Sequence, residues 1–574
     1  MANNFNNPIN ITEGAKQNKT ILNDRQKLAA GAPLKPLLII AGAGTGKTQT
    51  LTSRLIYVLE RLQGKETDIV AITFTNKAAN EMKDRIEKSK IDLAGKSVFV
   101  GTFHSFGAKL LRRECKNVGR QPDFTIFDDS DSLSLIKKII KSFNFKKKVS
   151  PTEIQNQISF VKNNLMFADE AIVNRSANKI SSLPAPKGNS QISKIESLNF
   201  SLAAHFNNQE IFEEIFKEYE NKLLENNAFD FDDLIEKPVV IFSQNPELAN
   251  EYAKKISHIL IDEYQDINKA QYALVKILAG KEGRLSAVGD DQQAIYSWRG
   301  ANFEFFLNFE KDWSESQIFV LDQNYRSTGN IINAASQIIK NNINQKPKIL
   351  WTERDSGKTI EIIEASDSAE EAQWIAGKLS EEKDLKGTAV LYRTNAQSRA
   401  IEEALLGSGI PYKIVGGLKF YERREIKDIV SALRIYSNPL DSVSAGRLEK
   451  LFGKIKFSEF KGKWFKSTKD KESLPVDLIS KFLNITSYFE SFKNNFVNSE
   501  ERKENIKELI GFASEFSDLR LFLEHLALFE ANDNSSAREG VRLTTIHLAK
   551  GLEFNKVFIA GCAEGLLPHA RAIL

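Results

Sequence analysis

The feature that most constrains the fold of this chain is a glycine-rich segment at residues 41–48, which reads AGAGTGKT. It follows the apolar run 37–40 and precedes a helical pattern. A strand, a glycine-rich loop and a helix in this order are typical of a phosphate-binding P-loop, because glycines let main-chain N–H groups face phosphate oxygens and a helix N-terminus attracts anions. We therefore expect Lys47 to reach the β- and γ-phosphates and the Thr48 hydroxyl to bind Mg²⁺. The phosphate-binding candidates are Ala41, Gly42, Ala43, Gly44, Thr45, Gly46, Lys47 and Thr48.

Two adjacent carboxylates provide the second chemical signal. Asp262 and Glu263 directly follow the apolar run 259–261, so a strand delivers both side chains at its C-terminal end. We expect Asp262 to hold the metal together with Thr48, and Glu263 to polarise the attacking water. A solvated acidic loop is the alternative for this pair taken alone. Together with the P-loop, the pair indicates nucleotide hydrolysis.

Short apolar strands and amphipathic helices alternate between residue 37 and about residue 119, which predicts a parallel, doubly wound sheet. Strand patterns return later, and helical stretches rich in Lys and Phe separate them. The later strands are expected at 256–261, 285–289, 318–321, 360–364, 388–392, 412–415, 541–546 and 556–560. The simplest interpretation is an α/β protein with two cores, each interrupted by a helical insertion.

Composition limits the class of protein further. The chain has 574 residues and a net charge of only +4, so any nucleic-acid site must come from local charge. Its apolar runs are far shorter than the ~20 residues of a membrane span. The polar N-terminus lacks the apolar core of a signal peptide, which predicts a cytoplasmic protein without a membrane anchor. The two cysteines, Cys115 and Cys562, are expected to be ordinary thiols in a reducing compartment.

Further segments resemble, in order along the chain, the characteristic motifs of superfamily 1A DNA helicases of the UvrD/PcrA/Rep type. The most specific segment is 262–266, which reads DEYQD, and the longest is 287–301, which reads AVGDDQQAIYSWRGA. The other matching segments are 22–26, 71–79, 101–106, 229–234, 321–327 and 544–554. Chance does not produce an ordered set of this kind, so the resemblance is very specific.

The resemblance implies roles for individual residues around the nucleotide. Gln26 would read the edge of the adenine ring, and Tyr325 would stack on its face. Gln293 would sense the γ-phosphate through its amide. Arg326 would act as an arginine finger that the second core supplies to the transferring phosphoryl group. Further nucleotide contacts from the second core are implied for Gly551 and Glu553.

The resemblance also implies contacts with single-stranded DNA. Aromatic side chains and a guanidinium plane can stack on bases without reading their sequence, at ~1–3 kcal/mol per base. Simple core filling is the alternative for the aromatic residues, and it has more weight for Phe103. The implied contact residues are Phe74, Thr102, His104, Tyr296, Trp298, Arg299, His547 and Lys550.

For the fold, the resemblance implies two RecA-like P-loop NTPase cores with parallel sheets, each carrying a mainly helical insertion. A sixth motif with another phosphate-binding arginine would follow soon after 564–569, so the chain is expected to be truncated and its second core incomplete. The expected divisions are a disordered tail at 1–18, a first core at 19–120 and 225–317 with its insertion at 121–224, and a second core at 318–430 and 541–574 with its insertion at 431–540.

The activity that the resemblance implies is ATP hydrolysis with Mg²⁺, coupled to 3′-to-5′ movement on single-stranded DNA and to strand separation at junctions with duplex. DNA repair or replication restart would be the setting, with repair or replication proteins as partners. An ATP- and DNA-binding fragment with little turnover is the alternative, because the sixth motif is expected to be missing. The motor half of a helicase-nuclease and an RNA substrate are weaker alternatives.

Two basic-aromatic stretches leave their role open. Lys137–Lys148 includes Phe143 and Phe145, and Lys454–Lys471 includes four aromatic residues. Both could contact duplex phosphates. Solvated lysines over a phenylalanine-rich helical core are an equally good interpretation.

Overall fold

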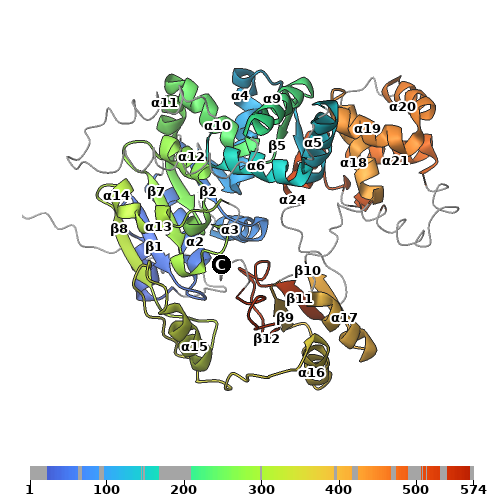
Figure 1. The fold of residues 1–574 in the computed structure, drawn as a ribbon. Helices are drawn as coiled ribbons and strands as arrows, with labels where there is room; N and C mark the ends of the chain where they lie inside the picture. Colours follow the sequence, from blue (N-terminus) through green and yellow to red (C-terminus); the bar gives the residue numbers. More distant parts are fainter. Residues whose placement is uncertain are drawn as a thin grey trace, which may run out of the picture. The chain divides into compact units, whose positions relative to one another are not determined.

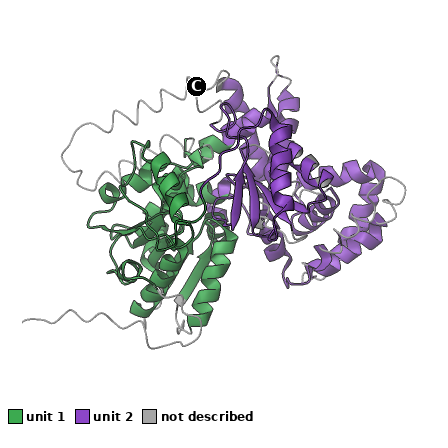
Figure 2. Cartoon of the chain, turned by 90° about the horizontal axis from the view of Figure 1, so that it is seen from below, with its two compact units in different colours: residues 1–111, 159–186, 234–358 green, residues 112–158, 187–233, 359–574 purple. Residues whose placement is uncertain are grey.

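The computed structural model describes residues 22–62, 67–89, 96–143, 145, 149–166, 209–297, 300–393, 397–415, 424–466, 474–488, 506, 509–511, 513–529 and 540–568 (Figure 1). The expected tail at 1–18 and the residues Trp298 and Arg299 lie outside these ranges. The chain divides into two compact units, which are coloured separately in Figure 2. Unit 1 contains residues 1–111, 159–186 and 234–358, and unit 2 contains residues 112–158, 187–233 and 359–574.

The described strands of unit 1 form one parallel sheet in the order β3-β2-β6-β7-β1-β8. Every residue of β1 is buried, as expected for a parallel strand covered on both faces. Leu37 and Ile39 pack on one face of the sheet, whereas Leu38 and Ile40 pack on the other. The strands are β1 (Leu37–Ala41), β2 (Thr67–Ile72), β3 (Lys96–Gly101), β6 (Ile256–Ile261), β7 (Leu285–Gly289) and β8 (Gln317–Leu321).

Helices cover both faces of this sheet, so the first predicted α/β core is confirmed. Apolar residues of α2 and α3 join the core on one face, and those of α4, α10 and α12 join the core on the other. The helices that lie wholly or mainly in this unit are α1 (Asp24–Ala30), α2 (Lys47–Arg61), α3 (Asn76–Ser89), α4 (Phe103–Glu114), α10 (Asp233–Gln244), α11 (Pro246–Lys255), α12 (Lys269–Ala279), α13 (Glu304–Leu307), α14 (Phe309–Asp312) and α15 (Gly329–Ile339), with the 3₁₀ turns η2 (Tyr264–Asp266) and η3 (Asp291–Gln293).

The strand that was expected to open the second core belongs to the first sheet. β8 pairs with β1 along its full length, and unit 1 continues to residue 358. The predicted boundary at residue 318 therefore differs from the structure. An apolar run predicts a strand but contains no information on which sheet the strand will join.

Unit 2 contains a second parallel sheet, in the order β10-β11-β9-β12. Its strands come from segments far apart in the sequence, which confirms an α/β core interrupted by an insertion. The elements are β9 (Thr388–Tyr392), β10 (Tyr412–Val415), β11 (Val541–Thr545) and β12 (Lys556–Ile559), with helices α16 (Ser368–Ser380) and α17 (Ser398–Gly407).

The strand predicted at 360–364 is wrong, because the structure has no strand there. Ile360, Ile362 and Ile363 are 56%, 93% and 47% exposed. The alternation of apolar and acidic residues suggested a half-buried strand, but a strand also needs a neighbour to pair with.

The two helical stretches also lie in unit 2, apart from the last residues of α6. The first includes a short parallel pair of strands, β4 with β5, which the sequence analysis did not predict. Its elements are η1 (Cys115–Val118), β4 (Thr125–Phe127), α5 (Asp129–Phe143), α6 (Pro151–Asn163), α9 (Gln209–Glu225) and β5 (Ala228–Asp230). The second contains α18 (Arg424–Ser437), α19 (Ser442–Phe452), α20 (Lys454–Lys466), α21 (Pro475–Thr486) and α24 (Leu519–Phe529).

The aromatic residues of the second basic stretch form a core. Phe457, Phe460 and Trp464 are buried together with Phe482 of α21, and the Trp464 indole donates to the Ala432 carbonyl at 3.2 Å. This favours the interpretation of lysines over a phenylalanine-rich core for this stretch. In the first stretch, Phe143 and Phe145 stack on each other with ring centroids 5.3 Å apart.

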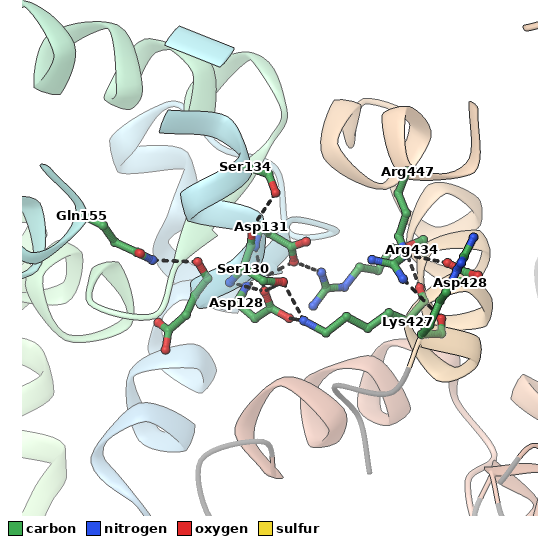
Figure 3. Close-up of polar contacts among 12 residues, drawn as sticks. Asp128, Ser130, Asp131, Ser134, Gln155, Lys427, Asp428, Arg434 and Arg447 are labelled. Atoms are coloured by element: carbon green, nitrogen blue, oxygen red, sulfur yellow. Dashed lines mark hydrogen bonds and ion pairs between the residues drawn. The ribbon is translucent and has the colours of Figure 1, made fainter. Parts of the chain in front are cut away.

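A polar cluster, buried at Arg434 and exposed at Ser130, joins α18 to the start of α5 (Figure 3). Arg434 forms an ion pair with Asp131, and the Lys427 ammonium lies 3.1 Å from Asp128. The Lys427 ammonium also donates to the Ser130 hydroxyl at 2.6 Å. We call these five residues the α5–α18 joint. It lies wholly within unit 2.

Both cysteines are free thiols, Cys115 buried and Cys562 exposed. Within the described ranges, no helix combines the length and the apolar character that crossing a bilayer requires.

Candidate functional site

The P-loop lies at the C-terminal end of β1 and leads into α2. Gly44 and Gly46 have φ angles of +67° and +83°, a conformation that residues with side chains rarely adopt. A Cβ atom on Gly46 would also meet the Gln26 amide nitrogen at 2.7 Å. The loop therefore requires glycine at both positions, as the P-loop interpretation expects.

The two catalytic candidates of the acidic motif face the first residues of α2. The Thr48 hydroxyl donates to the Asp262 carboxylate at 3.0 Å, and the Lys47 ammonium lies 3.6 Å from the Glu263 carboxylate. β6 and β1 end at the same edge of the parallel sheet, and this brings together residues more than 200 positions apart.

Burial and mutual repulsion control the charges at this position. Burial and the neighbouring Glu263 raise the pKa of Asp262 to about 7, although Lys47 and Thr48 act in the opposite direction. Burial alone would lower the pKa of Lys47, but the surrounding carboxylates, Glu263 first and then Asp290 and Asp262, outweigh it and raise that pKa. The excess of carboxylates over ammonium groups suits a divalent cation between Thr48 and Asp262.

Glu263 has a strained backbone. Its φ and ψ angles are +52° and +46°, the left-handed region that residues other than glycine, asparagine and aspartate rarely occupy. Strained residues of this kind gather at functional sites, where the surrounding structure holds them in place. The conformation is therefore a further indication of function at Glu263.

A chain of amides links this acidic pair to the third motif. The Gln265 amide donates to the Glu263 carboxylate at 2.6 Å and accepts from the Asp290 main-chain N–H at 2.9 Å. Asp290 in turn accepts a hydrogen bond from the Gln293 side chain. The candidate sensor Gln293 is thus connected to Glu263 through two residues that the sequence analysis did not single out.

Lys348 is another residue that the sequence analysis missed. Its ammonium is fully buried and lies 2.8 Å from both Asp290 and Asp291. This contact could not be predicted from the sequence, because Lys348 lies nearly 60 residues from either partner. Lys348 neutralises two carboxylates next to the candidate site.

Segment 321–327 packs directly on the P-loop. The Asn324 side chain donates to the Ala43 carbonyl at 2.6 Å, and the Tyr325 main-chain N–H donates to the Gly44 carbonyl at 2.9 Å. A Cβ atom on Gly44 would lie 2.7 Å from the Arg326 Cβ. Arg326 was expected to come from the second core, but the structure places it in unit 1, beside the P-loop. The reason is that β8, which it follows, pairs in the first sheet.

Helix α1 completes this side of the P-loop. The Gln26 amide donates to the Thr45 carbonyl at 2.8 Å and accepts from the Asn23 main-chain N–H at 2.9 Å. The Asn23 side chain also donates to the Tyr325 hydroxyl at 2.7 Å. The two residues expected to contact adenine, Gln26 and Tyr325, are thereby linked through Asn23.

Among the candidates for DNA contact, two aromatic side chains meet. Phe74 and Tyr296 stack with ring centroids 5.2 Å apart and an interplanar angle of 22°, and both are partly exposed. His104 is partly exposed and Thr102 is buried, and Phe103 is buried in the core, as its favoured interpretation expects.

The remaining candidates lie in unit 2, in the segment that follows β11. His547 Nδ1 lies 3.5 Å from the Arg393 guanidinium, and Gly551 has a φ of +81°. The structure therefore gathers the candidates of unit 2 in one loop at the C-terminal end of a parallel strand, where ligands of such sheets bind. These residues are His547, Lys550, Gly551 and Glu553.

Comparison with known proteins agrees with this geometry. The family model of the UvrD/REP helicase N-terminal domain matches residues 22–314, and that of the UvrD-like helicase C-terminal domain matches residues 319–460 and 455–574. The ATP-dependent DNA helicase PcrA of Bacillus subtilis (strain 168) is 37% identical over 612 residues, which cover 96% of this chain and 79% of that protein. The protein of the same name from Staphylococcus aureus (strain Mu50) is 37% identical over 605 residues, with the same coverage. The chain therefore belongs to the UvrD/REP helicase family.

Proposed function

We propose that this protein is an ATP-dependent DNA helicase that moves 3′ to 5′ on single-stranded DNA and separates duplex strands during DNA repair or replication restart. The observation that carries the ATP-hydrolysing part is the meeting of Thr48 with Asp262 and of Lys47 with Glu263 at the P-loop. The direction, the preference for single strands and junctions, and the cellular process rest on family membership.

In this proposal, each residue at the P-loop has a distinct task. Main-chain N–H groups of the loop bind the phosphates, and Lys47 holds the β- and γ-phosphates. Thr48 and Asp262 would hold Mg²⁺, which neutralises charge on the phosphates. Glu263 orients the attacking water and accepts its proton, and Gln265 fixes the Glu263 carboxylate by a hydrogen bond. Arg326 stabilises the charge that develops on the transferring phosphoryl group.

DNA would bind through stacking and phosphate contacts. The Phe74–Tyr296 stack offers a platform for bases, and Thr102 and His104 would add contacts from segment 101–106. The segment with His547 and Lys550 would supply contacts from the second core. Gln293 would connect nucleotide binding with DNA binding, because segment 287–301 contains both Gln293 and Tyr296.

The first test is ATP hydrolysis with and without a single-stranded oligonucleotide. Lys47→Ala should lower the DNA-stimulated rate on the order of a hundredfold or more, because it removes a cation from the transferring phosphate. Lys35→Ala is the matched control, since Lys35 is an exposed lysine of the same unit that pairs with Glu315. Strand separation of duplexes with a 3′ or a 5′ single-stranded tail tests the direction.

Two results would contradict the proposal. Equal rates for Lys47→Ala and the unmodified protein would exclude the P-loop as the hydrolytic site. Binding of ATP and DNA without turnover would instead support a binding protein with little hydrolysis.

A further inference from the structure

Arg54 is a fully buried arginine on α2, two turns beyond Lys47, that the proposed function does not use. Its guanidinium donates to the carbonyls of Ala30, at 3.3 Å, of Ala32 and of Pro33, at 2.8 Å. Its Nε donates to the Ser286 hydroxyl at 3.1 Å. We call the contacts with the three carbonyls the Arg54 clamp.

The clamp is unusual because no carboxylate among the described residues forms an ion pair with this cation. Burial lowers the pKa of Arg54 to about 10, so the side chain stays charged at neutral pH. A buried cation without an anion is costly unless its donors are all used. The flat, forked guanidinium can reach three carbonyls of one loop at once, whereas a lysine ammonium is a single point. The arrangement therefore depends on arginine and fixes the backbone of the loop.

The Arg54 clamp holds the chain where α1 ends. Ala30 is the last residue of α1, and Pro33 lies shortly before β1. At its other end, α1 contacts the P-loop through Gln26, whose amide donates to the Thr45 carbonyl. Helix α1 is thus fixed at both ends to the segment formed by the P-loop and α2.

The position of α1 matters for nucleotide recognition, because α1 carries Gln26 and α2 begins at the P-loop. The phosphates bind at the start of α2, and the adenine ring is proposed to bind at Gln26 on α1. The distance between the two subsites depends on how α1 sits against α2. Arg54 belongs to α2, and its contact with α1 is at Ala30, the end of the helix that lies away from Gln26.

We propose that Arg54 is a positioning residue for base recognition, which holds α1 so that Gln26 meets adenine while the P-loop holds the phosphates. This inference rests on the proposed function, since it assumes an adenine nucleotide at the P-loop. Arg54 acts through α1 and has no contact with the reacting atoms.

The test compares dissociation constants for ADP and GDP, so it does not depend on turnover. The unmodified protein should prefer ADP, and Arg54→Lys should reduce the ratio of the two constants about tenfold, mainly by weakening ADP. Ser286→Ala is the matched control. It removes the contacts of Arg54 and His258 with the Ser286 hydroxyl but none of the three carbonyl contacts, so stability should fall while the ratio stays unchanged.

A double-mutant cycle with Gln26→Leu separates positioning from general damage. If Arg54 acts through Gln26, then Arg54→Lys should cause no further loss of ADP preference in the Gln26→Leu protein. If Arg54→Lys does not fold, insertion of two glycines after Gly31 frees α1 from the clamp while keeping Arg54. That insertion should give the same loss of preference.

Three results would overturn the inference: no preference for ADP in the unmodified protein, equal weakening of ADP and GDP by Arg54→Lys or by the insertion, or additive losses in the cycle. Failure of the proposed function would look different. It would appear as absent DNA-stimulated hydrolysis while the binding constants for ADP and GDP still report on Arg54.

Discussion

Two buried arginines, Arg54 in unit 1 and Arg434 in unit 2, show two ways in which this protein stabilises an internal cation. Arg54 donates to three main-chain carbonyls and a hydroxyl. Arg434 pairs with the Asp131 carboxylate and lies near Asp128, which pairs with Lys427. The first arrangement fixes the backbone of one loop. The second joins helices about 300 residues apart in the sequence.

The two arrangements differ in whether the partners of the arginine can bind protons. Carbonyl oxygens keep the same charge at every pH, so the Arg54 clamp depends little on acidity. In the α5–α18 joint, burial raises the pKa of Asp131 despite Arg434. Burial would also raise the pKa of Asp128, but Arg434 and Lys427 outweigh it and hold that pKa below its usual range. The joint is therefore a coupled set of charges whose balance requires both cations.

The largest effect is expected for Arg434→Met, which removes the cation that offsets the charges of Asp128, Asp131 and Asp441 and leaves Lys427 as the remaining cation of the joint. Breaking a buried ion pair by removing one partner typically costs about 3–5 kcal/mol. Hydrogen exchange in peptides from α5 and α18 should report a loss of this size in local stability at pH 7.5.

A second substitution and a change of pH sharpen this prediction. Asp131→Asn in the Arg434→Met protein should recover part of the loss, because it removes one unpaired charge. Without Arg434, the carboxyls bind protons more readily in the folded state than in the unfolded state. Lowering the pH from 7.5 to 5.5 should then recover part of the lost stability, at up to about 1.4 kcal/mol per pH unit for each proton bound. A loss that neither change relieves would mean that Arg434 acts through packing.

His258 also contacts Ser286, the hydroxyl partner of Arg54, with its Nε2 2.8 Å from the Ser286 hydroxyl. Burial lowers its pKa to about 3, with Arg54 and Arg284 adding to the effect. Below pH 6.5 the unfolded chain takes up a proton that the folded chain refuses, so His258 makes folding less favourable as the pH falls.

Between pH 6.5 and pH 5 this loss amounts to about 2 kcal/mol. His258→Gln should abolish it, so the variant should gain about that much stability relative to the unmodified protein over this range in urea titrations. Above pH 7.5 the difference between the two proteins should be constant, which is the internal control. A constant difference down to pH 5 would show that His258 takes up its proton in the folded state.

Much of the geometry of the candidate site could be predicted because its signals are local. The P-loop, the pair Asp262 and Glu263, and the strands that precede them each show in a few neighbouring residues. Lys348 and Arg54 could not be found in this way. Their partners lie far along the chain, and a lysine or arginine in a helical or polar stretch looks like any solvated cation.

In the fold, too, features with local signals could be predicted and features that depend on distant segments could not. Parallel α/β cores follow from apolar runs and helical periodicity, and both cores were predicted. The sheet to which β8 belongs and the short pair of β4 with β5 depend on pairing between distant segments. The α5–α18 joint is also non-local, since Asp131 and Arg434 are about 300 residues apart.

The smallest effect is expected for Ser130→Ala, which removes a hydroxyl from the edge of the joint. This hydroxyl accepts from Lys427 at 2.6 Å and donates to Asp128 at 2.8 Å. The position is exposed, so water can replace both contacts, and the expected loss is about 0.5–1 kcal/mol by hydrogen exchange in α5.

Ser134→Ala is the matched control for this substitution, because the Ser134 hydroxyl donates only to the Ser130 carbonyl of its own helix (Figure 3). It should leave the contact between α5 and α18 unchanged. A loss for Ser130→Ala as large as that for Arg434→Met would mean that the hydroxyl organises the charges. A small loss would mean that charge pairing itself holds the two helices together. In that case the joint differs from the Arg54 clamp, whose strength lies in the geometry of neutral acceptors.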